Sequence, residues 1–140
     1  MNHLVFLDTH AGELEKILSG IKSMILRKIN PELPAAESVA PSDSLYFLKN
    51  NGDCTLRVRA TVVRVLPSMN SLGEDLSRTL KELQPRLQLT EDQYNYWATK
   101  ERVMLVEFDQ AHKIEVIHVA ANKISDRLDW IAFEELSEIT

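Results

Sequence analysis

The run of residues 55–66 alternates between apolar and polar side chains, and this pattern constrains the fold more than any other. Leu56 and Val58 fall on one side of an extended strand, whereas Arg57 and Arg59 fall on the other side. Such a strand buries its apolar face only when neighbouring strands and a core lie against it. The sequence therefore predicts a sheet in which one face of this segment turns inward.

Other segments also have the apolar content and flanking turn residues that are typical of strands. A helix is expected after the N-cap types Asp8 and Thr9, and Gly20 is expected to end it. Residues 67–89 are helical in character, and Thr90 opens a further helix through a capping box. Six strands and about three helices indicate an α+β fold, a small curved mixed sheet that closes into a barrel with flanking helices. The expected strands are residues 3–7, 22–28, 44–49, 55–66, 102–108 and 114–119, the last two joined by a turn at 109–113.

The chain of 140 residues has the size of one domain, and we expect a single domain over residues 1–140. Its 21 acidic and 16 basic residues give a net charge of −5, which excludes a protein that coats nucleic acid nonspecifically. The lone cysteine, Cys54, excludes a disulfide framework and a cysteine-rich zinc site within the chain. The N-terminal residues lack the features of a signal peptide and no apolar run is long enough to span a membrane, so we expect a cytoplasmic protein.

Motifs that bind common cofactors and metals do not occur in the sequence. The four glycines are scattered, so there is no glycine-rich phosphate loop. The four histidines share no metal-ligand spacing, and neither HExxH nor G-x-S-x-G is present. We therefore expect no cofactor, no metal ion and no membrane partner, and the sequence does not set the oligomeric state.

The basic residues are unevenly distributed along the chain. Residues 22–64 contain seven basic and four acidic side chains, a net charge of +3, whereas residues 114–140 contain two basic and six acidic ones, a net charge of −4. If the first strands share a face, their cations form a patch that can hold phosphates. The alternative is a solvated strand face that needs charged side chains only for solubility.

A second group of residues combines aromatic rings with cations. Tyr94 and Trp97 lie three residues apart on an expected helix, and Lys100 and Arg102 follow them. Base stacking beside cations is the chemistry of a single-stranded RNA site. The alternative is that both rings pack against the core.

Five motifs occur in an order that is similar to that of the ASCH family, a branch of the PUA-like superfamily. Residues 20–27 resemble its G-x-K-x-x-x-x-R strand, and residues 42–47 resemble its G-D-x-L-x-F strand entry, with Ser42 in place of glycine. Residues 59–65 and 97–100 resemble its a-x-V-x-x-V strand and W-x-x-K step, and a strand at 103–108 follows. The resemblance covers roughly residues 3–120.

The resemblance implies a PUA-like barrel and a basic cleft between the barrel and the helices, which binds RNA or a nucleotide-like ligand. Lys22, Arg27, Trp97 and Lys100 match the motif positions that line this cleft. Arg59, on the alternating strand, adds a further cation. The predicted binding residues are therefore Lys22, Arg27, Arg59, Trp97 and Lys100.

Some ASCH relatives hydrolyse an acylated cytidine, and others cleave RNA, so the resemblance also implies an alternative function as a hydrolase. The amidohydrolases use the motif lysine, which is Lys22 here, and a threonine at a position that Ile25 occupies in this chain. Ser23 is a substitute candidate for the threonine, and Glu74 and Glu107 are candidates for a distant glutamate. A third interpretation is an interaction module whose cleft has no ligand.

Overall fold

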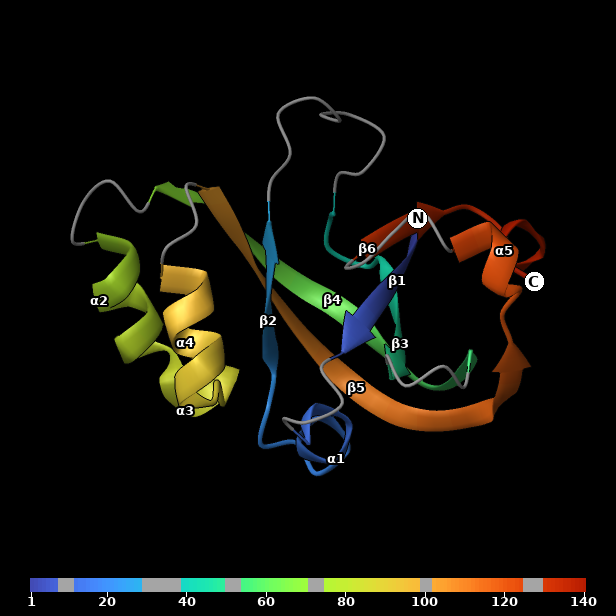
Figure 1. Cartoon of the computed structure of the whole chain (residues 1–140), viewed down its shortest axis with the longest axis horizontal. Coiled ribbons are helices and arrows are strands. Elements are labelled where there is room, and N and C mark those ends of the chain that lie inside the picture. Colours follow the sequence, from blue (N-terminus) through green and yellow to red (C-terminus); the bar gives the residue numbers. More distant parts are fainter. Residues whose placement is uncertain (8–11, 29–38, 50–53, 71–74, 99–101, 125–129) are drawn as a thin grey trace.

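The structure of the chain is a computed structural model in which one mixed sheet of six strands forms the framework (Figure 1). The strand order is β2-β5-β4-β3-β1-β6, so β2 and β6 are the outer strands. The structure describes residues 1–7, 12–28, 39–49, 54–70, 75–98, 102–124 and 130–140. The strands are β1 (Asn2–Leu7), β2 (Met24–Lys28), β3 (Ser44–Lys49), β4 (Thr55–Asn70), β5 (Arg102–His118) and β6 (Trp130–Phe133).

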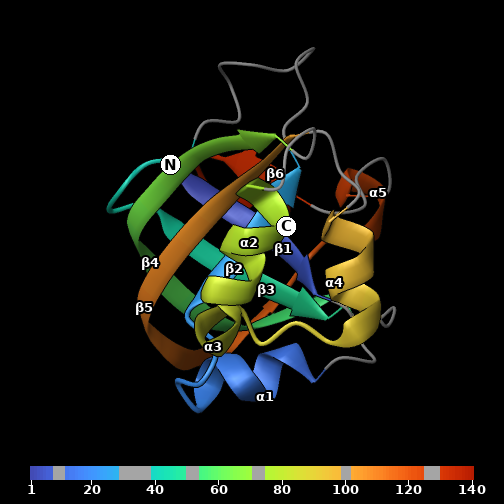
Figure 2. The same ribbon diagram turned by 90° about the vertical axis from the view of Figure 1, so that its left-hand side faces the viewer.

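The sheet curls into a half-barrel. β1 pairs in parallel with β3, and the other neighbouring strands pair antiparallel. The long strands β4 and β5 curve together around the outside of the molecule (Figure 2). Their register shifts at four places, and such bulges bend and twist a strand pair. The expected α+β fold with a curved mixed sheet is confirmed, with the barrel half closed.

The helices gather in three places around the half-barrel (Figure 1). The group α2–α4 lies at one end of the molecule beside β2, α1 lies below β2, and α5 lies at the other end near β6. No helix in the described part of the chain has the length and apolar character that a membrane crossing needs. The helices are α1 (Glu13–Leu18), α2 (Asp75–Glu82), α3 (Gln84–Leu87), α4 (Glu91–Ala98), α5 (Ala121–Ile124) and the 3-10 turn η1 (Leu136–Glu138).

Both faces of β2 are covered, because the strand lies between the barrel interior and the helical group. Met24 and Leu26 pack on the helix side with Leu80 and Leu87, whereas Ile25 belongs to the interior core. Successive side chains of a strand point to opposite faces, which accounts for this division. β2 therefore separates two apolar clusters, the interior core and a helix-side cluster that contains Met24, Leu26, Leu80 and Leu87.

The hairpin expected between residues 103–108 and 114–119 is wrong. β5 runs without interruption from Arg102 to His118 and pairs with β4 along this length. The expected turn is instead a bulge, where Gln110 adopts a left-handed backbone with φ 56° and one extra residue enters β5. A bulge absorbs the same polar residues that a turn would, so the sequence pattern does not separate the two.

The expected helix over residues 67–89 begins later than predicted. β4 continues to Asn70, because Met69 and Asn70 still pair with β5, and α2 starts only at Asp75. Pro67 falls within a shift of register, where a strand tolerates a residue without an N–H donor. The segment Trp130–Phe133, which is not among the six expected strands, forms β6 beside β1.

Several local turns follow the expected chemistry. Gly20, just after α1, has φ 83°, a conformation that glycine adopts without strain. Ser42 has φ 78° and thus keeps the glycine-like backbone at the position where the ASCH pattern has glycine. Thr90 and Gln93 form the expected capping box, since each side chain accepts a hydrogen bond from the other's backbone N–H.

A buried hydrogen-bonded chain connects β1, β6 and the start of β3. The indole Nε1 of Trp130 donates to Nδ1 of His3 at 3.0 Å, so the ring proton of His3 lies on Nε2. That Nε2 donates to Asp43 at 2.9 Å. Burial lowers the pKa of His3 below 6.5, against the opposing effect of Asp43, and keeps the imidazole neutral at neutral pH.

The two outer strands of the sheet meet across the open side of the half-barrel. The guanidinium carbon of Arg27, on β2, lies 4.8 Å from the ring centre of Trp130, on β6. A guanidinium over an indole face is a favourable cation–π arrangement, and it is stronger where water is excluded. Both side chains are buried, so this contact fastens the seam between β2 and β6 at one point.

We expect Arg27→Ala to lower the free energy of unfolding by roughly 1–3 kcal/mol, because the variant loses the cation–π contact and the packing of the side-chain stem. Urea denaturation followed by circular dichroism measures the change. Lys113→Ala, at an exposed position of β5, is the control and should change stability by less than about 0.5 kcal/mol. Equal stability of the Arg27 variant and the wild type would show that this contact does not fasten the seam.

Candidate ligand-binding cleft

A cleft of about 430 Å³ lies between β1, β2, α1 and α4. It begins where the pairing of β6 with β1 ends, since β6 pairs with residues 2–5 whereas Phe6 and Leu7 continue beyond it. The cleft is therefore the open part of the same seam that Arg27 and Trp130 close. Its lining consists of Val5, Phe6, Leu7, Glu13, Lys22, Ile25, Leu26, Leu89, Asp92, Gln93, Tyr96 and Trp97.

Lys22 stands between α1 and β2 and is held there by the backbone. Its N–H donates to the carbonyl of Lys16 at 3.0 Å. The next residue, Ser23, donates its N–H to Arg86 and accepts from the N–H of Phe108. These bonds tie the segment to α1, α3 and β5, so the position of the Lys22 side chain is set by three elements.

The ammonium of Lys22 is buried among oxygen atoms. The side chain is 1% exposed, and its Nζ donates a hydrogen bond to the carbonyl oxygen of Leu87. The Glu13 carboxylate lies 3.7 Å from Nζ, and its side chain is also buried. Burial lowers the pKa of Lys22 from 10.5 to about 8, although Glu13 opposes this shift. The amine is therefore half neutral near pH 8, within reach of proton-transfer chemistry.

The aromatic wall of the cleft comes from α4. Trp97 is partly buried against the helix-side cluster and also lines the cleft. The ring therefore packs against the core, as one interpretation held, and also borders the cleft, as the base-stacking interpretation requires. Tyr96 is 52% exposed, and its ring meets Trp97 edge to face with centroids 5.2 Å apart. One ring thus supports the other at the mouth of the cleft.

The charge of the lining differs from the basic cleft that the sequence led us to expect. The charged side chains among the described lining residues are Lys22, Glu13 and Asp92, which are one cation and two acids. Among the described residues, those of the cleft included, no group of three or more metal-ligating side chains is arranged to hold a metal ion. The described lining therefore suits an uncharged or weakly charged group better than a phosphate.

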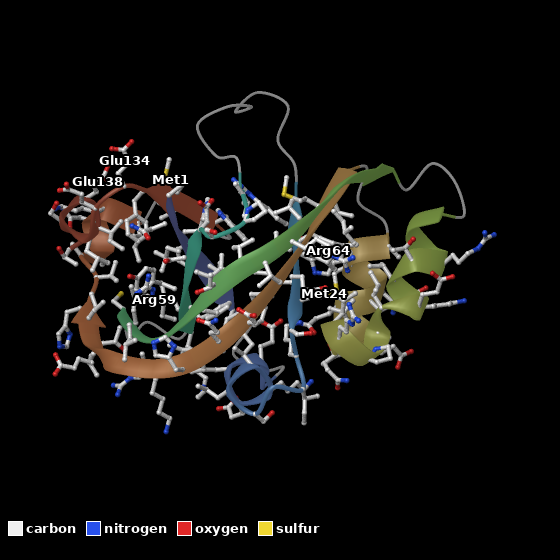
Figure 3. The ribbon with its side chains drawn as sticks, turned by 180° about the vertical axis from the view of Figure 1, so that it is seen from behind. Met1, Met24, Arg59, Arg64, Glu134 and Glu138 are labelled. Atoms are coloured by element: carbon white, nitrogen blue, oxygen red, sulfur yellow. The ribbon has the colours of Figure 1, made fainter. Side chains whose placement is uncertain are left out.

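The predicted binding residues lie in different places. Lys22 and Trp97 meet in the cleft, although they are far apart in the sequence. Arg27 lies over Trp130 and is not part of the cleft lining. Arg59 donates to Ser44 Oγ at 2.7 Å and lies on the part of β4 away from α2–α4 (Figure 3). Lys100 lies outside the described residues.

The candidates for catalysis are also dispersed. Ile25 lines the cleft at the position of the family threonine, whereas Ser23 is not among the lining residues. Glu107 lies elsewhere and accepts from Arg64 and Arg86, each at 3.0 Å. Glu74 lies outside the described residues.

Sequence reasoning did not identify Glu13 and Tyr96 as cleft residues. Glu13 lies in the first turn of α1, where an acid also interacts favourably with the helix dipole, and its carboxylate is the one beside Lys22. The sequence prediction paired Tyr94 with Trp97, yet Tyr94 packs against the core and Tyr96 lines the cleft. The sequence signal that could have identified Tyr96 is its position directly before Trp97.

Comparison with known proteins places the fold. No family model and no curated protein matches the chain. Among solved structures it is similar to ASCH from Zymomonas mobilis, with 15% identity, a TM-score of 0.67, and coverage of 98% of this chain and 90% of that one. A Tyr-to-Phe variant of that protein gives 14% identity, a TM-score of 0.68, and 98% and 92% coverage. The N-terminal domain of Staphylothermus marinus McrB gives 8% identity, a TM-score of 0.53, and 99% and 92% coverage.

At these identities the similarity defines the fold alone. The chain has an ASCH-domain fold, and the resemblance drawn from the ordered motifs of its sequence is confirmed at that level. The half-barrel with flanking helices is the α+β architecture that the resemblance implied.

The lowered pKa of Lys22 predicts how the free energy of unfolding changes with pH. A lysine whose pKa is lowered by folding binds fewer protons than it does in the unfolded chain, so stability rises with pH between about 8 and 10.5 and falls as pH drops through that window. We expect the free energy of unfolding of wild type to gain roughly 3 kcal/mol relative to Lys22→Met across this range.

Urea denaturation of both proteins over this pH range measures the difference. Lys81→Met, at an exposed position of α2, is the control, and its difference from wild type should stay constant. Parallel curves for wild type and Lys22→Met would contradict the lowered pKa.

Proposed function

We propose that the cleft binds one nucleotide of RNA, or a nucleotide-like ligand, with the base against the indole of Trp97. The observation that carries the proposal is that Lys22, between α1 and β2, and Trp97, on α4, line one cavity of about 430 Å³. This volume lies in the range of small-molecule sites, and aromatic rings beside polar groups are typical of them. The resemblance to ASCH domains implies the same ligand class.

The burial of Lys22 gives it a defined part in binding. Its ammonium already contacts Glu13 and the Leu87 carbonyl, so it presents a polarised N–H group rather than a free charge. A hydroxyl or carbonyl oxygen of a nucleoside is a suitable acceptor for such a group. Binding through it depends less on salt than binding through exposed cations.

We expect Trp97→Leu to weaken binding of a short single-stranded RNA by about 5- to 100-fold, because a base stacked on an aromatic ring gains roughly 1–3 kcal/mol. Leucine keeps an apolar side chain against the helix-side cluster, so the fold is retained. Trp97→Phe is the matched control, since it keeps an aromatic face and should lose less than Trp97→Leu. Fluorescence anisotropy of a labelled oligonucleotide gives the dissociation constants, and equal affinity of the Leu variant and wild type would refute stacking.

A second candidate function is hydrolysis of an acyl group from a modified nucleoside, and the pair Lys22–Glu13 favours it. A neutral Lys22 amine can accept a proton from water while the water oxygen adds to the acyl carbonyl carbon. The carbon–nitrogen bond then breaks as Lys22 returns that proton to the amine nitrogen, which leaves a carboxylic acid and the free nucleoside. Glu13 stabilises the ammonium between the two transfers.

Incubation of the protein with N4-acetylcytidine, followed by chromatography, tests this activity. We expect the rate to rise with pH and to level off above about pH 8, because the amine is then neutral. Lys22→Met should abolish turnover, whereas Lys81→Met, at an exposed position of α2, should leave it unchanged. Turnover that persists in Lys22→Met would exclude Lys22 as the base, and absence of turnover by wild type would leave binding as the function.

A further inference from the structure

The cleft runs along strand edges rather than over a strand face. Ile25 and Leu26 are consecutive on β2, and both line the cleft. Their side chains point to opposite faces of the sheet, so one cavity meets both only where it follows the edge of the strand. The same holds for Phe6 and Leu7 on β1. The main chain between these side chains therefore borders the cleft.

The hydrogen-bond pattern of β2 shows which main-chain groups face that edge. Phe108 N–H donates to the carbonyl of Ser23 at 3.0 Å, and the register continues with Ile25 opposite Val106. In an antiparallel pair, hydrogen-bonded positions alternate with positions that point away. Ser23, Ile25 and Arg27 therefore bond to β5, whereas the N–H and C=O of Met24, Leu26 and Lys28 point to the free edge. Of these three residues, Leu26 is the one that lines the cleft.

This edge has no neighbouring strand in the described sheet, because β2 is the terminal strand of the order. Leu26 is 8% exposed, so water reaches its surroundings poorly. A buried main-chain donor and acceptor require partners, and leaving them without partners costs roughly 1–3 kcal/mol each. The partner that fits must present an acceptor beside a donor on one flat edge.

The rest of the cleft narrows the class of this partner. Across from β2 the rings of Trp97 and Tyr96 offer a stacking surface. The carboxylates of Glu13 and Asp92 disfavour a phosphate inside, and the Lys22 ammonium is already engaged by Glu13. A neutral planar heterocycle meets all these conditions.

We propose that the main-chain N–H and C=O of Leu26 read the Watson–Crick edge of a nucleobase held in the cleft, while the ribose and phosphate remain outside it. The proposal rests on the proposed function, and it adds which part of the nucleotide enters and what recognises it. Each base carries a donor beside an acceptor on that edge, which matches the donor and acceptor of one strand residue.

An extended peptide that adds a strand to β2 is the competing occupant of the edge. The base is favoured because strand addition needs a continuous open edge. Here α4 places Trp97 and Tyr96 at the mouth of the cleft, and Arg27 packed on Trp130 closes the neighbouring part of the seam. Of the three residues whose main-chain groups point to the free edge, Leu26 lines this cavity of small-molecule size, whereas Met24 and Lys28 are not among its described lining residues.

The test titrates the protein with the four ribonucleosides, their 5′-monophosphates, and neutral analogues methylated on the Watson–Crick edge. The strongest nucleoside should lose about tenfold or more in affinity on methylation, because one Leu26 group is left without its partner. The monophosphate should bind within about threefold of the nucleoside. In heteronuclear NMR spectra the Leu26 amide should shift downfield and gain protection from hydrogen exchange. The Ile25 amide, which already bonds to β5, should gain no protection.

A pair of variants tests the same groups from the protein side. Leu26→Pro removes the main-chain N–H that points to the free edge and breaks no hydrogen bond to β5. Leu26→Val keeps this N–H. The Pro variant should lose nucleoside binding that the Val variant retains, and the NMR measurement stands if the Pro variant does not fold.

The outcomes separate the two proposals. If the methylated analogue binds as tightly as the unmodified nucleoside and the Leu26 amide does not shift, this inference is overturned and the proposed function stands. A monophosphate that binds far more tightly than its nucleoside would have the same consequence. Protection of Leu26 by a Val–Thr repeat peptide and by no nucleoside would assign the edge to strand addition. Failure of every nucleoside and of a short RNA to bind would overturn both.

Discussion

The contact between the Arg27 guanidinium and the Trp130 indole determines where the half-barrel is closed and where it is open. The two side chains come from the outer strands of the sheet, β2 and β6, and their contact fastens these strands at one point. Trp130 is the first residue of β6 and pairs with Val5. Beyond it β1 stays paired with β3 but has no β6 partner on its other side, so the fastened seam and the candidate cleft are two parts of one feature.

The cleft combines features that a closed barrel would not provide. An open seam leaves the edge of β2 without a neighbour and gives the Leu26 main chain access to a ligand. It also leaves room for Lys22 to be buried beside Glu13, where desolvation lowers the pKa of its amine. α4 then covers the opening with Trp97. The proposed base binding and the proposed proton transfer therefore both depend on the same incomplete closure.

Local sequence patterns predicted the parts of the structure that short-range chemistry determines. The alternation in residues 55–66 predicted a strand with one buried face, and the ordered motifs placed Lys22 and Trp97 in one cleft. Long-range register was not predictable, because nothing near Glu13 in the sequence indicates that it lies beside Lys22. The direction of the Arg27 side chain was not predictable for a related reason. The local sequence pattern around an arginine is the same whether its guanidinium is exposed or stacks on a buried indole.

The central claim is that the open seam holds a nucleobase between the β2 edge and Trp97, and a crystal structure of the protein soaked with its strongest-binding nucleoside tests it most directly. Our account predicts the base in the seam, with its Watson–Crick edge within hydrogen-bond distance of Leu26 N–H and C=O and its face on Trp97. A nucleoside bound instead on the outer surface, at Arg59 or beside Arg64, would contradict the account.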